Sequence, residues 1–121
     1  MTLPLTPEML AAAYEYLRHS PPFRSWKLPP AVVVRFKVSR RPGEFGRYQW
    51  DGEKHTISMS AKSIGQTETL LRYLAHEMIH LHLEATGQES KRGGLNVHNA
   101  AFKRYAARVC KIHGWDPKSF Y

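Results

Sequence analysis

The sequence predicts one α+β domain that spans residues 1–121, with a small sheet in its first half and two helices in its second. Two observations support this prediction. Short runs of β-branched and aromatic residues occur between residues 31 and 60, separated by proline and glycine turn signals. Apolar residues then recur at helical spacing from residue 67 onward. A chain of 121 residues has room for one modest hydrophobic core, which favours a single domain.

The first half is predicted to form a helix and then a three-stranded antiparallel or mixed sheet. Thr6 can cap the helix and Pro7 suits its first turn, whereas Pro21 and Pro22 cannot continue it. The Asp51-Gly52 pair between two alternating segments is a hairpin signal. The predicted elements are a helix at 6–18 and strands at 31–38, 46–50 and 55–60.

The second half is predicted to form two helices, at 67–85 and 97–113. Gly87 and Gly114 follow the two segments at positions where a left-handed residue commonly ends a helix. Asn96 can cap the second helix. At about 100° per residue, one broad apolar arc of the first helix is predicted to face the core. Its members are Leu70, Leu71, Leu74, Ala75, Met78, Leu81 and Ala85.

The most specific motif is His76-Glu77-Met78-Ile79-His80, an HExxH sequence within the 67–85 helix. A helix repeats about every 3.6 residues, so the two histidines lie one turn apart on the same face. Both imidazoles can therefore bind one Zn²⁺, at about 2.0–2.1 Å. Glu77 is then free to act as the general base, which removes a proton from the attacking water. An oxyanion-stabilising group is also expected, and Tyr73, Tyr105 and His82 are candidates.

A catalytic zinc site needs about three protein ligands and one open position. Glu84 lies eight residues after His76, which is about 12 Å of axial rise, so one ion cannot comfortably reach both. His98 is the predicted third ligand, because it opens the last predicted helix and that helix carries apolar residues on the same face. His113 is the second choice. His19 and His55 are expected on the surface or at the core edge, and His82 on the core side of the 67–85 helix.

The chain has a formal net charge of +8 and an isoelectric point near 9.9, which suits a polyanionic partner such as nucleic acid. No basic leader and no run of 18 apolar residues occurs, so we expect neither signal peptide nor membrane span. The single cysteine, Cys110, rules out an internal disulfide and a cysteine-based zinc ribbon. We therefore expect a cytoplasmic protein, nucleoid-associated or nuclear according to its source.

The segment 69–81, TLLRYLAHEMIHL, resembles the active helix of SprT-like (Spartan-type) metalloproteases. The resemblance continues through Arg92-Gly93-Gly94 to His98, with Phe102 four residues later, and includes the two hairpin segments before the active helix. It implies a zincin-like α+β domain that binds one zinc ion and cleaves proteins, commonly proteins bound or crosslinked to DNA. By position, it implies that His76, His80 and His98 are ligands and that Glu77 is the catalytic base.

Two departures from the family pattern concern the third histidine and the partner. Val97 and Asn99 replace the glycines that flank this histidine in the family. The cysteine-rich zinc module of many members is absent, so any DNA contact must come from basic residues of this domain. We expect a monomer that favours single-stranded DNA. The candidate DNA contacts are Arg35, Lys37, Arg40, Arg41, Arg47, Lys91, Arg92 and Arg104, with Lys103, Arg108 and Lys111 beside the last of them.

Aromatic residues are interleaved with the first basic cluster and leave two interpretations open. Exposed rings could stack on unpaired bases, or the rings could be buried beneath a solvated basic face. The aromatic residues are Phe36, Phe45, Tyr48 and Trp50. Three other functions stay open: a small zincin peptidase that acts without DNA, a zinc-dependent ribonuclease, and a catalytically idle zinc-stabilised DNA-binding module.

Overall fold

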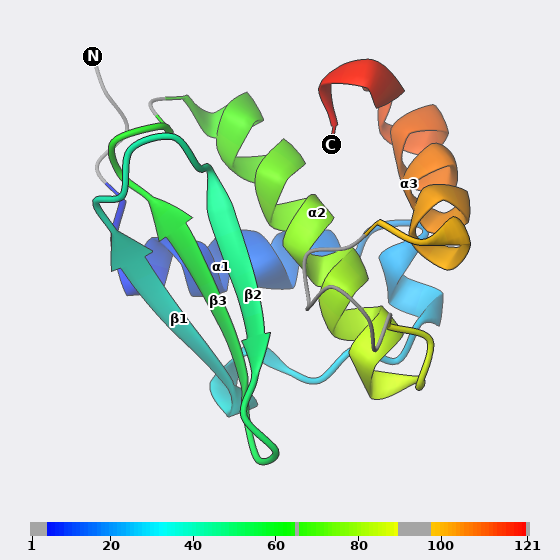
Figure 1. Ribbon diagram of the computed structural model, residues 1–121, viewed down its shortest axis with the longest axis horizontal. Coiled ribbons are helices and arrows are strands. Elements are labelled where there is room, and N and C mark those ends of the chain that lie inside the picture. The colour runs from blue at the N-terminus through cyan, green and yellow to red at the C-terminus, as the bar shows by residue number, and fades with distance from the viewer. Residues whose placement is uncertain (1–4, 65, 90–97, 121) are drawn as a thin grey trace.

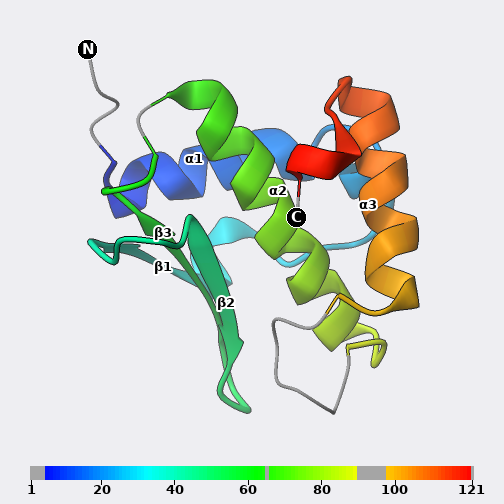
Figure 2. The same ribbon diagram turned by 45° about the horizontal axis from the view of Figure 1, so that its top comes forward.

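The computed structural model describes residues 5–64, 66–89 and 98–120 and confirms the predicted α+β class (Figure 1). Within these residues, the chain order is α1 (Pro7–Arg18), β1 (Val34–Ser39), β2 (Gly46–Trp50), β3 (His55–Ser60), α2 (Thr67–Ala85) and α3 (Ala100–His113). Figures 1 and 2 both place α2 between the sheet and α3. Helix α1 packs against both β1 and α2.

The sheet is mixed, with the strand order β1-β3-β2. The central strand, β3, runs parallel to β1 and antiparallel to β2. The β2–β3 hairpin turns at Asp51-Gly52 as predicted, where Gly52 has a φ of +96° and the Asp51 carboxylate accepts from two backbone N–H groups. Alternate residues of each strand face the helices, and the buried ones are Val34, Tyr48, Ile57 and Met59. The opposite face of the sheet carries polar side chains.

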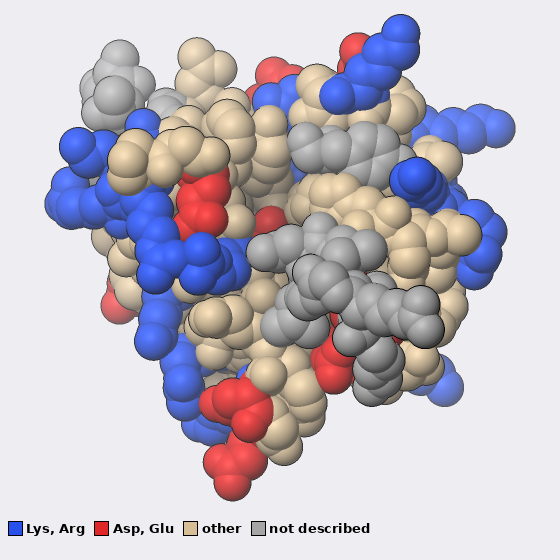
Figure 3. Space-filling view, viewed as in Figure 1, with Lys and Arg blue, Asp and Glu red and all other residues tan. Residues whose placement is uncertain are grey.

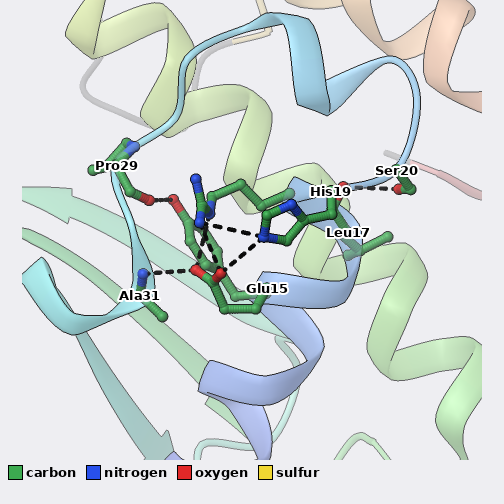
Figure 4. Close-up of polar contacts among 8 residues, drawn as sticks. Glu15, Leu17, His19, Ser20, Pro29 and Ala31 are labelled. Carbon is green, nitrogen blue, oxygen red and sulfur yellow. Dashed lines mark hydrogen bonds and ion pairs between the residues drawn. The ribbon is translucent and has the colours of Figure 1, made fainter.

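Helix α1 has the predicted N-cap and the predicted end, and polar contacts join its last turns to the chain before β1. The Thr6 hydroxyl accepts from the Met9 N–H at 3.1 Å. Near the other end, the Glu15 carboxylate accepts from Arg18 and from the Ala31 N–H at 2.8 Å (Figure 4). The Tyr14 hydroxyl donates to the Pro29 carbonyl at 2.7 Å. These bonds fix the position at which the chain enters the sheet.

The predicted strand at 31–38 is wrong in its first three residues. Ala31–Val33 form a 3₁₀ turn, and the strand begins at Val34. The Ala31 N–H donates to Glu15 and the Val33 N–H to the Pro30 carbonyl, so neither group is available to a sheet ladder. The side chain of Val32 is 88 % exposed. The contact with α1 therefore overrides the strand propensity of these β-branched residues.

Helix α2 has the predicted bounds, and it is buried on more than the predicted arc. Ten consecutive residues, 74–83, are buried, because α1, the sheet and α3 all pack around the helix. Ile79 and Leu83 are completely buried although they lie outside the predicted apolar arc. Ala85, which was predicted to face the core, is exposed at the last turn. The HExxH motif consequently lies in the most enclosed part of the described chain.

The start of the last helix differs from the prediction and its end agrees with it. The N-cap is Asn99, whose side chain accepts from the Phe102 N–H at 2.8 Å, so His98 precedes the helix. The predicted cap, Asn96, and Val97 lie outside the described residues. Gly114 ends α3 with a φ of +75°, and residues 115–120 then fold back toward α2, where Phe120 is completely buried. None of the described helices is long and apolar enough to cross a membrane.

Replacement of Glu15 by Gln tests the junction between α1 and the sheet. Hydrogen bonds from Arg18 and Ala31 lower the pKa of Glu15 from 4.5 to about 2. Because the folded pKa lies below the unfolded value, the carboxylate stabilises the fold above about pH 4.5, and this contribution is lost as the pH falls toward 2. A third of the side chain is exposed, so we expect a loss of about 1 kcal/mol at pH 7.

Urea unfolding of wild type, Glu15→Gln and the exposed control Glu53→Gln checks this prediction. The stability difference between wild type and Glu15→Gln should narrow as the pH is lowered from 5 to 3. A difference that is independent of pH, or one that Glu53→Gln reproduces, would contradict it.

Candidate metal centre and active-site cleft

Three histidines from two segments meet at the middle of α2. His76, His80 and His98 each offer a ring nitrogen, and these nitrogens all lie within 4.8 Å of one another. The Nε2 atoms of His76 and His98 are 3.2 Å apart. His76 and His80 are buried, whereas His98 is partly exposed and stacks on Phe102 with 4.2 Å between ring centroids. The stack on Phe102, in the first turn of α3, holds His98 toward the helix that carries the other two.

The outer nitrogens of the two α2 histidines face hydrogen-bond acceptors. Nδ1 of His76 donates to the Phe120 carbonyl at 2.9 Å, and Nδ1 of His80 donates to the Glu89 carboxylate at 2.9 Å. A carbonyl and a carboxylate can only accept, so each Nδ1 carries the hydrogen and each Nε2 keeps its lone pair. Metal-ligating histidines commonly have this arrangement, which orients the ring and raises its basicity.

The environment keeps two of these imidazoles in the neutral form that binds metals. Burial, together with the neighbouring His80, lowers the pKa of His76 from 6.5 to about 3. Burial is also the main cause that lowers the pKa of His98. Protonation of either ring would put a cation in a largely enclosed site, which is unfavourable. The lone pairs are therefore available at neutral pH.

Glu77 is a buried carboxyl group, and within the described residues no cationic side chain pairs with it. Its side chain is almost fully enclosed, and its Oε1 atom has no hydrogen-bond partner among the described residues. Burial is the main cause that raises the pKa of Glu77 from 4.5 to about 8, and the charges of Glu44 and Glu89 add to it. No lysine or arginine of the described chain forms an ion pair with Glu77 or Glu89. A divalent cation beside these carboxyl groups would favour their ionised form.

The residues present fit a zinc ion. Tetrahedral zinc with nitrogen ligands at 2.0–2.1 Å needs nitrogens about 3.3 Å apart, close to the 3.2 Å between His76 and His98. Nε2 of His80 is buried and has no partner within the described chain, which is costly unless something binds it. Three neutral imidazoles beside two carboxyl groups also match the charge of a divalent ion. His76, His80 and His98 could thus hold the metal, with Glu77 adjacent to it.

A cleft of about 260 Å³ opens onto this group from the side of the sheet. Its floor is formed by His76, Glu77 and His98, and its rim by Tyr73 and residues 44–46. The rings of Phe45 and Tyr73 stack across the rim, with centroids 3.9 Å apart. Two hydrogen bonds hold the loop before β2 in place: the Ser60 hydroxyl donates to the Arg41 carbonyl and the Ser63 hydroxyl to the Glu44 carbonyl. A substrate would therefore meet a preformed rim.

Gly46, the first residue of β2, allows the strand to approach α2 closely. A Cβ atom at this position would lie 2.8 Å from the Met59 sulfur and 3.3 Å from Oε2 of Glu77. Met59 is completely buried and cannot move aside without disturbing the core. The absence of a side chain at Gly46 thus makes room for Glu77 under the strand.

The other candidate groups lie away from the cleft. His82 stacks on Trp26 at 4.4 Å, and Tyr105 contacts the same indole edge-on at 5.0 Å. Neither lines the cleft, so Tyr73 is the one predicted oxyanion candidate that does. Glu84, which was rejected as a third metal ligand, is not a member of the histidine cluster. The remaining histidines have structural partners: His113 stacks on Trp115, His55 contacts Tyr48 and His19 contacts Glu15.

The predicted DNA contacts fall on two separate surfaces. Arg35, Lys37, Arg40 and Arg41 are exposed on β1 and the turn after it, and Arg47 is partly exposed on β2. Arg104 is exposed on α3, which Figures 1 and 2 place across α2 from the sheet. Lys91 and Arg92 lie outside the described residues. Two of the four interleaved aromatic residues pack in the core, since Tyr48 is buried and Phe36 packs on Tyr14, whereas Phe45 and Trp50 are 37 % and 36 % exposed.

Sequence reasoning missed Glu89 and the Phe120 carbonyl. Glu89 lies two residues after Gly87, which reverses the chain at the end of α2, and the Glu89 N–H donates to the Leu83 carbonyl. Phe120 returns to α2 only because Gly114 reverses the chain after α3. A polar residue shortly after a helix-ending glycine was the available signal for Glu89. No local pattern indicates a backbone carbonyl as a partner.

An α+β fold with three converging histidines, two of them from HExxH, and an adjacent buried glutamate defines a zincin-like, metalloprotease-like domain. The profile of the SprT-like family matches residues 13–119, which is most of the chain. The protein belongs to the SprT-like family, in agreement with the resemblance seen in the sequence. A comparison with curated proteins gives no match.

Replacement of Glu89 tests its role beside His80. Glu89→Ala removes both the hydrogen-bond acceptor and the charge, and we expect zinc affinity to fall by about 10–100-fold. Glu89→Gln keeps an acceptor oxygen for Nδ1, so its loss should be smaller. Competition with a chromophoric chelator measures the affinities. Glu84→Ala and Glu84→Gln, in the last turn of the helix that carries His80, are the controls. Equal zinc affinity in Glu89→Ala and wild type would exclude the role.

Replacement of Gly46 by Ala tests the close approach of β2 to Glu77. The added methyl group must displace Met59 or Glu77, so we expect destabilisation of about 1–3 kcal/mol, as is usual for overpacking. Chemical unfolding of the metal-free protein measures this loss. Gly43→Ala is the comparison variant. It adds a methyl group in open space at a φ of +84°, so it measures backbone strain without crowding. If Gly46→Ala is as stable as wild type, the strand has more room than this geometry allows.

Proposed function

We propose that this protein is a zinc-dependent endopeptidase that cleaves proteins bound or crosslinked to DNA. The observation that supports the proposal best is the cleft itself, because His76, Glu77 and His98 line it and the ring of the buried His80 belongs to the same histidine cluster. When bound there, zinc polarises the scissile carbonyl and lowers the pKa of water. Membership of the SprT-like family supports the same chemistry.

The chain's own groups suit peptide hydrolysis. Oε1 of Glu77 has no partner within the described chain, and a divalent cation beside this carboxyl group would favour its ionised form, so it could take a proton from the attacking water and pass it to the leaving amine. Tyr73 lies at the rim, where its hydroxyl could stabilise developing charge. The strand order leaves β2 at the edge of the sheet, and Gly46 of this strand lines the cleft, so an extended peptide could pair with the strand.

The DNA part of the proposal is supported by charge and by the family resemblance. The net charge of +8 favours a polyanionic partner, and basic side chains cover the sheet beside the cleft. Phe45 and Trp50, both partly exposed, are the aromatic residues through which single-stranded DNA could be favoured. We expect the protein to act as a monomer.

The zinc-loaded protein should cleave a basic DNA-bound protein, and Glu77→Gln should lower the rate by about 100-fold or more while zinc stays bound. The loss is expected because Gln cannot accept the proton from water. Gel electrophoresis of the substrate and metal analysis of both proteins provide the measurements. Glu84→Gln is the matched control and should cleave at the wild-type rate.

The same assay separates the alternative functions. We expect faster cleavage with single-stranded DNA than with duplex DNA or with none. Equal cleavage without DNA would indicate a DNA-independent peptidase, and cleavage of RNA alone would indicate a ribonuclease. A zinc-loaded protein that cleaves neither its DNA-bound substrate nor an unstructured protein would be an idle module. Wild-type cleavage rates in Glu77→Gln would exclude the assigned base.

A further inference from the structure

The face of the sheet that is turned away from the helices carries a row of basic and polar side chains. In the strand register, Lys37 of β1 and Arg47 of β2 flank Ser58 of β3, and Arg35 and Gln49 flank Thr56 in the next row. Arg40 and Arg41 extend this basic face at the turn after β1. Figure 3 shows lysine and arginine side chains gathered over the sheet, along the left side of the view.

A hollow of about 200 Å³ lies within this basic face. Lys37, Arg41 and Arg47 line it together with the Ser58 hydroxyl, and all of these groups can donate hydrogen bonds. Glu44 is the acidic residue of the lining, and it forms ion pairs with Arg47 at 3.4 Å and Arg41 at 3.8 Å. Three cations against one carboxylate leave a surplus of positive charge. The hollow is therefore suited to an anion.

The guanidinium of Arg47 is only partly satisfied in this arrangement. Its NH2 group donates to Glu44, but its Nε atom is buried and has no partner among the described residues. An unpaired buried donor is unfavourable, and a phosphate oxygen is the type of acceptor that a guanidinium binds with two parallel bonds. A side chain that lines the hollow thus carries an unpaired donor in addition to its charge.

Glu44 belongs to the linings of both the basic hollow and the active-site cleft. The two depressions thus meet at one residue of the loop before β2. A phosphate in the basic hollow would lie next to the rim over which a substrate passes. DNA held there would present its bound protein to the cleft, which a distant binding surface could not do.

The face supports contacts with phosphates rather than with bases. The alternation along the strands turns the aromatic residues to the other side, where Phe36 packs on Tyr14 and Tyr48 is buried. Trp50 shares the parity of Tyr48, and its ring lies against His55 at 4.6 Å. Basic side chains without stacking platforms bind the nucleic-acid backbone regardless of sequence.

The basic surface of α3 is the weaker candidate. Its exposed residues Lys103, Arg104, Arg108 and Lys111 follow helical spacing, which is typical of a solvated helix face. Lys111 in the last turn also interacts favourably with the helix dipole. None of these residues lines a hollow of the described structure that adjoins the cleft.

We propose that the hollow formed by Lys37, Arg41, Arg47 and Ser58 binds a phosphate of the DNA backbone and holds DNA beside the active-site cleft. The inference rests on the proposed function in naming DNA as the polyanion. It assigns sequence-independent binding to the outer sheet face, with little difference between single-stranded and duplex DNA at this face. A preference for single strands would then come from exposed rings outside this face, such as Phe45 at the cleft rim.

Two charge-matched double variants test the location of the site. Lys37→Ala/Arg41→Ala removes two cations from the sheet face, and Arg104→Ala/Arg108→Ala removes two from α3. The zinc-loaded proteins are titrated against labelled DNA of about 20 nucleotides, single-stranded and duplex, from about 50 to 200 mM salt. Fluorescence anisotropy measures the affinity and its salt dependence. Circular dichroism and zinc content verify that both variants are folded.

The sheet variant should bind DNA about 10-fold more weakly than wild type, or worse. The slope of its log affinity against log salt concentration should be smaller in magnitude by about 1–2. The affinity of the α3 variant should stay within about 3-fold of wild type. The ratio of the variant's affinity to the wild-type affinity should be the same for single-stranded and duplex DNA. An equal or larger loss in the α3 variant would overturn the proposal. So would tighter binding of vesicles with anionic lipid than of DNA, or an unchanged slope in the sheet variant.

Cleavage by the wild-type protein is measured separately, on an unstructured protein without DNA. A protein that cleaves this substrate but shows no loss of DNA affinity in the sheet variant has the proposed activity and lacks the proposed site. A protein that binds DNA as expected but cleaves nothing has the site and lacks the activity. The two proposals can therefore fail independently.

Discussion

The structure depends on one constraint: the most buried stretch of its most buried helix carries two histidines and a glutamate. Each of these groups loses hydration when α1, the sheet and α3 close around α2. Buried polar groups of this kind are unfavourable unless every donor and acceptor is paired. The surrounding chain pairs the outer nitrogens of His76 and His80, but Nε2 of His80 and Oε1 of Glu77 have no partner among residues 5–64, 66–89 and 98–120. Three of the unpaired buried atoms of the described chain, Nε2 of His80 and one oxygen each of Glu77 and Glu89, thus lie together, and their surroundings have the composition of a zinc site.

The two partners of the α2 histidines come from segments that follow helix ends, and both segments return through a glycine in the left-handed region. Gly87 precedes Glu89, and Gly114 begins the return that brings Phe120 to His76. The last turn of α2 and the tail after α3 are therefore parts of the candidate metal centre rather than ends of helices. Since the hydrogen bonds from Nδ1 favour the tautomer that keeps the lone pair on Nε2 and orient the rings, metal binding and the docking of these two segments should be thermodynamically coupled.

Local patterns in the sequence were sufficient wherever one residue type decides a local conformation. The cap at Thr6, the hairpin at Asp51-Gly52 and the bounds of α2 all follow from such signals, and HExxH indicated the metal chemistry. Prediction failed where a distant group intervened. Glu15 takes the N–H of Ala31 and delays β1, and Asn99 caps α3 three residues later than Asn96 would. The same side chain of Asn99 donates to the Gln88 carbonyl, so a departure from the family's glycine pattern here joins α3 to the end of α2. Glu89 and Phe120 could not be predicted because only the tertiary fold brings them to α2.

Side chains along each strand of the sheet alternate between its two faces, so the three strands give this small domain two different surfaces. On the inner side, Gly46 of β2 lies close to α2 and lines the cleft, and Tyr48 is buried in the core, whereas Arg47 between them points to the outer side. A shift of β2 by one residue would exchange these faces and place a guanidinium over Glu77, so the register of β2 controls both the cleft and the basic face. The hydrogen bonds of Ser60 and Ser63 to the preceding loop hold that register. Glu44, in the same loop, forms ion pairs with Arg41 and Arg47 on the outer side and also lines the cleft. Its carboxylate therefore couples the electrostatics of the basic face to those of the cleft.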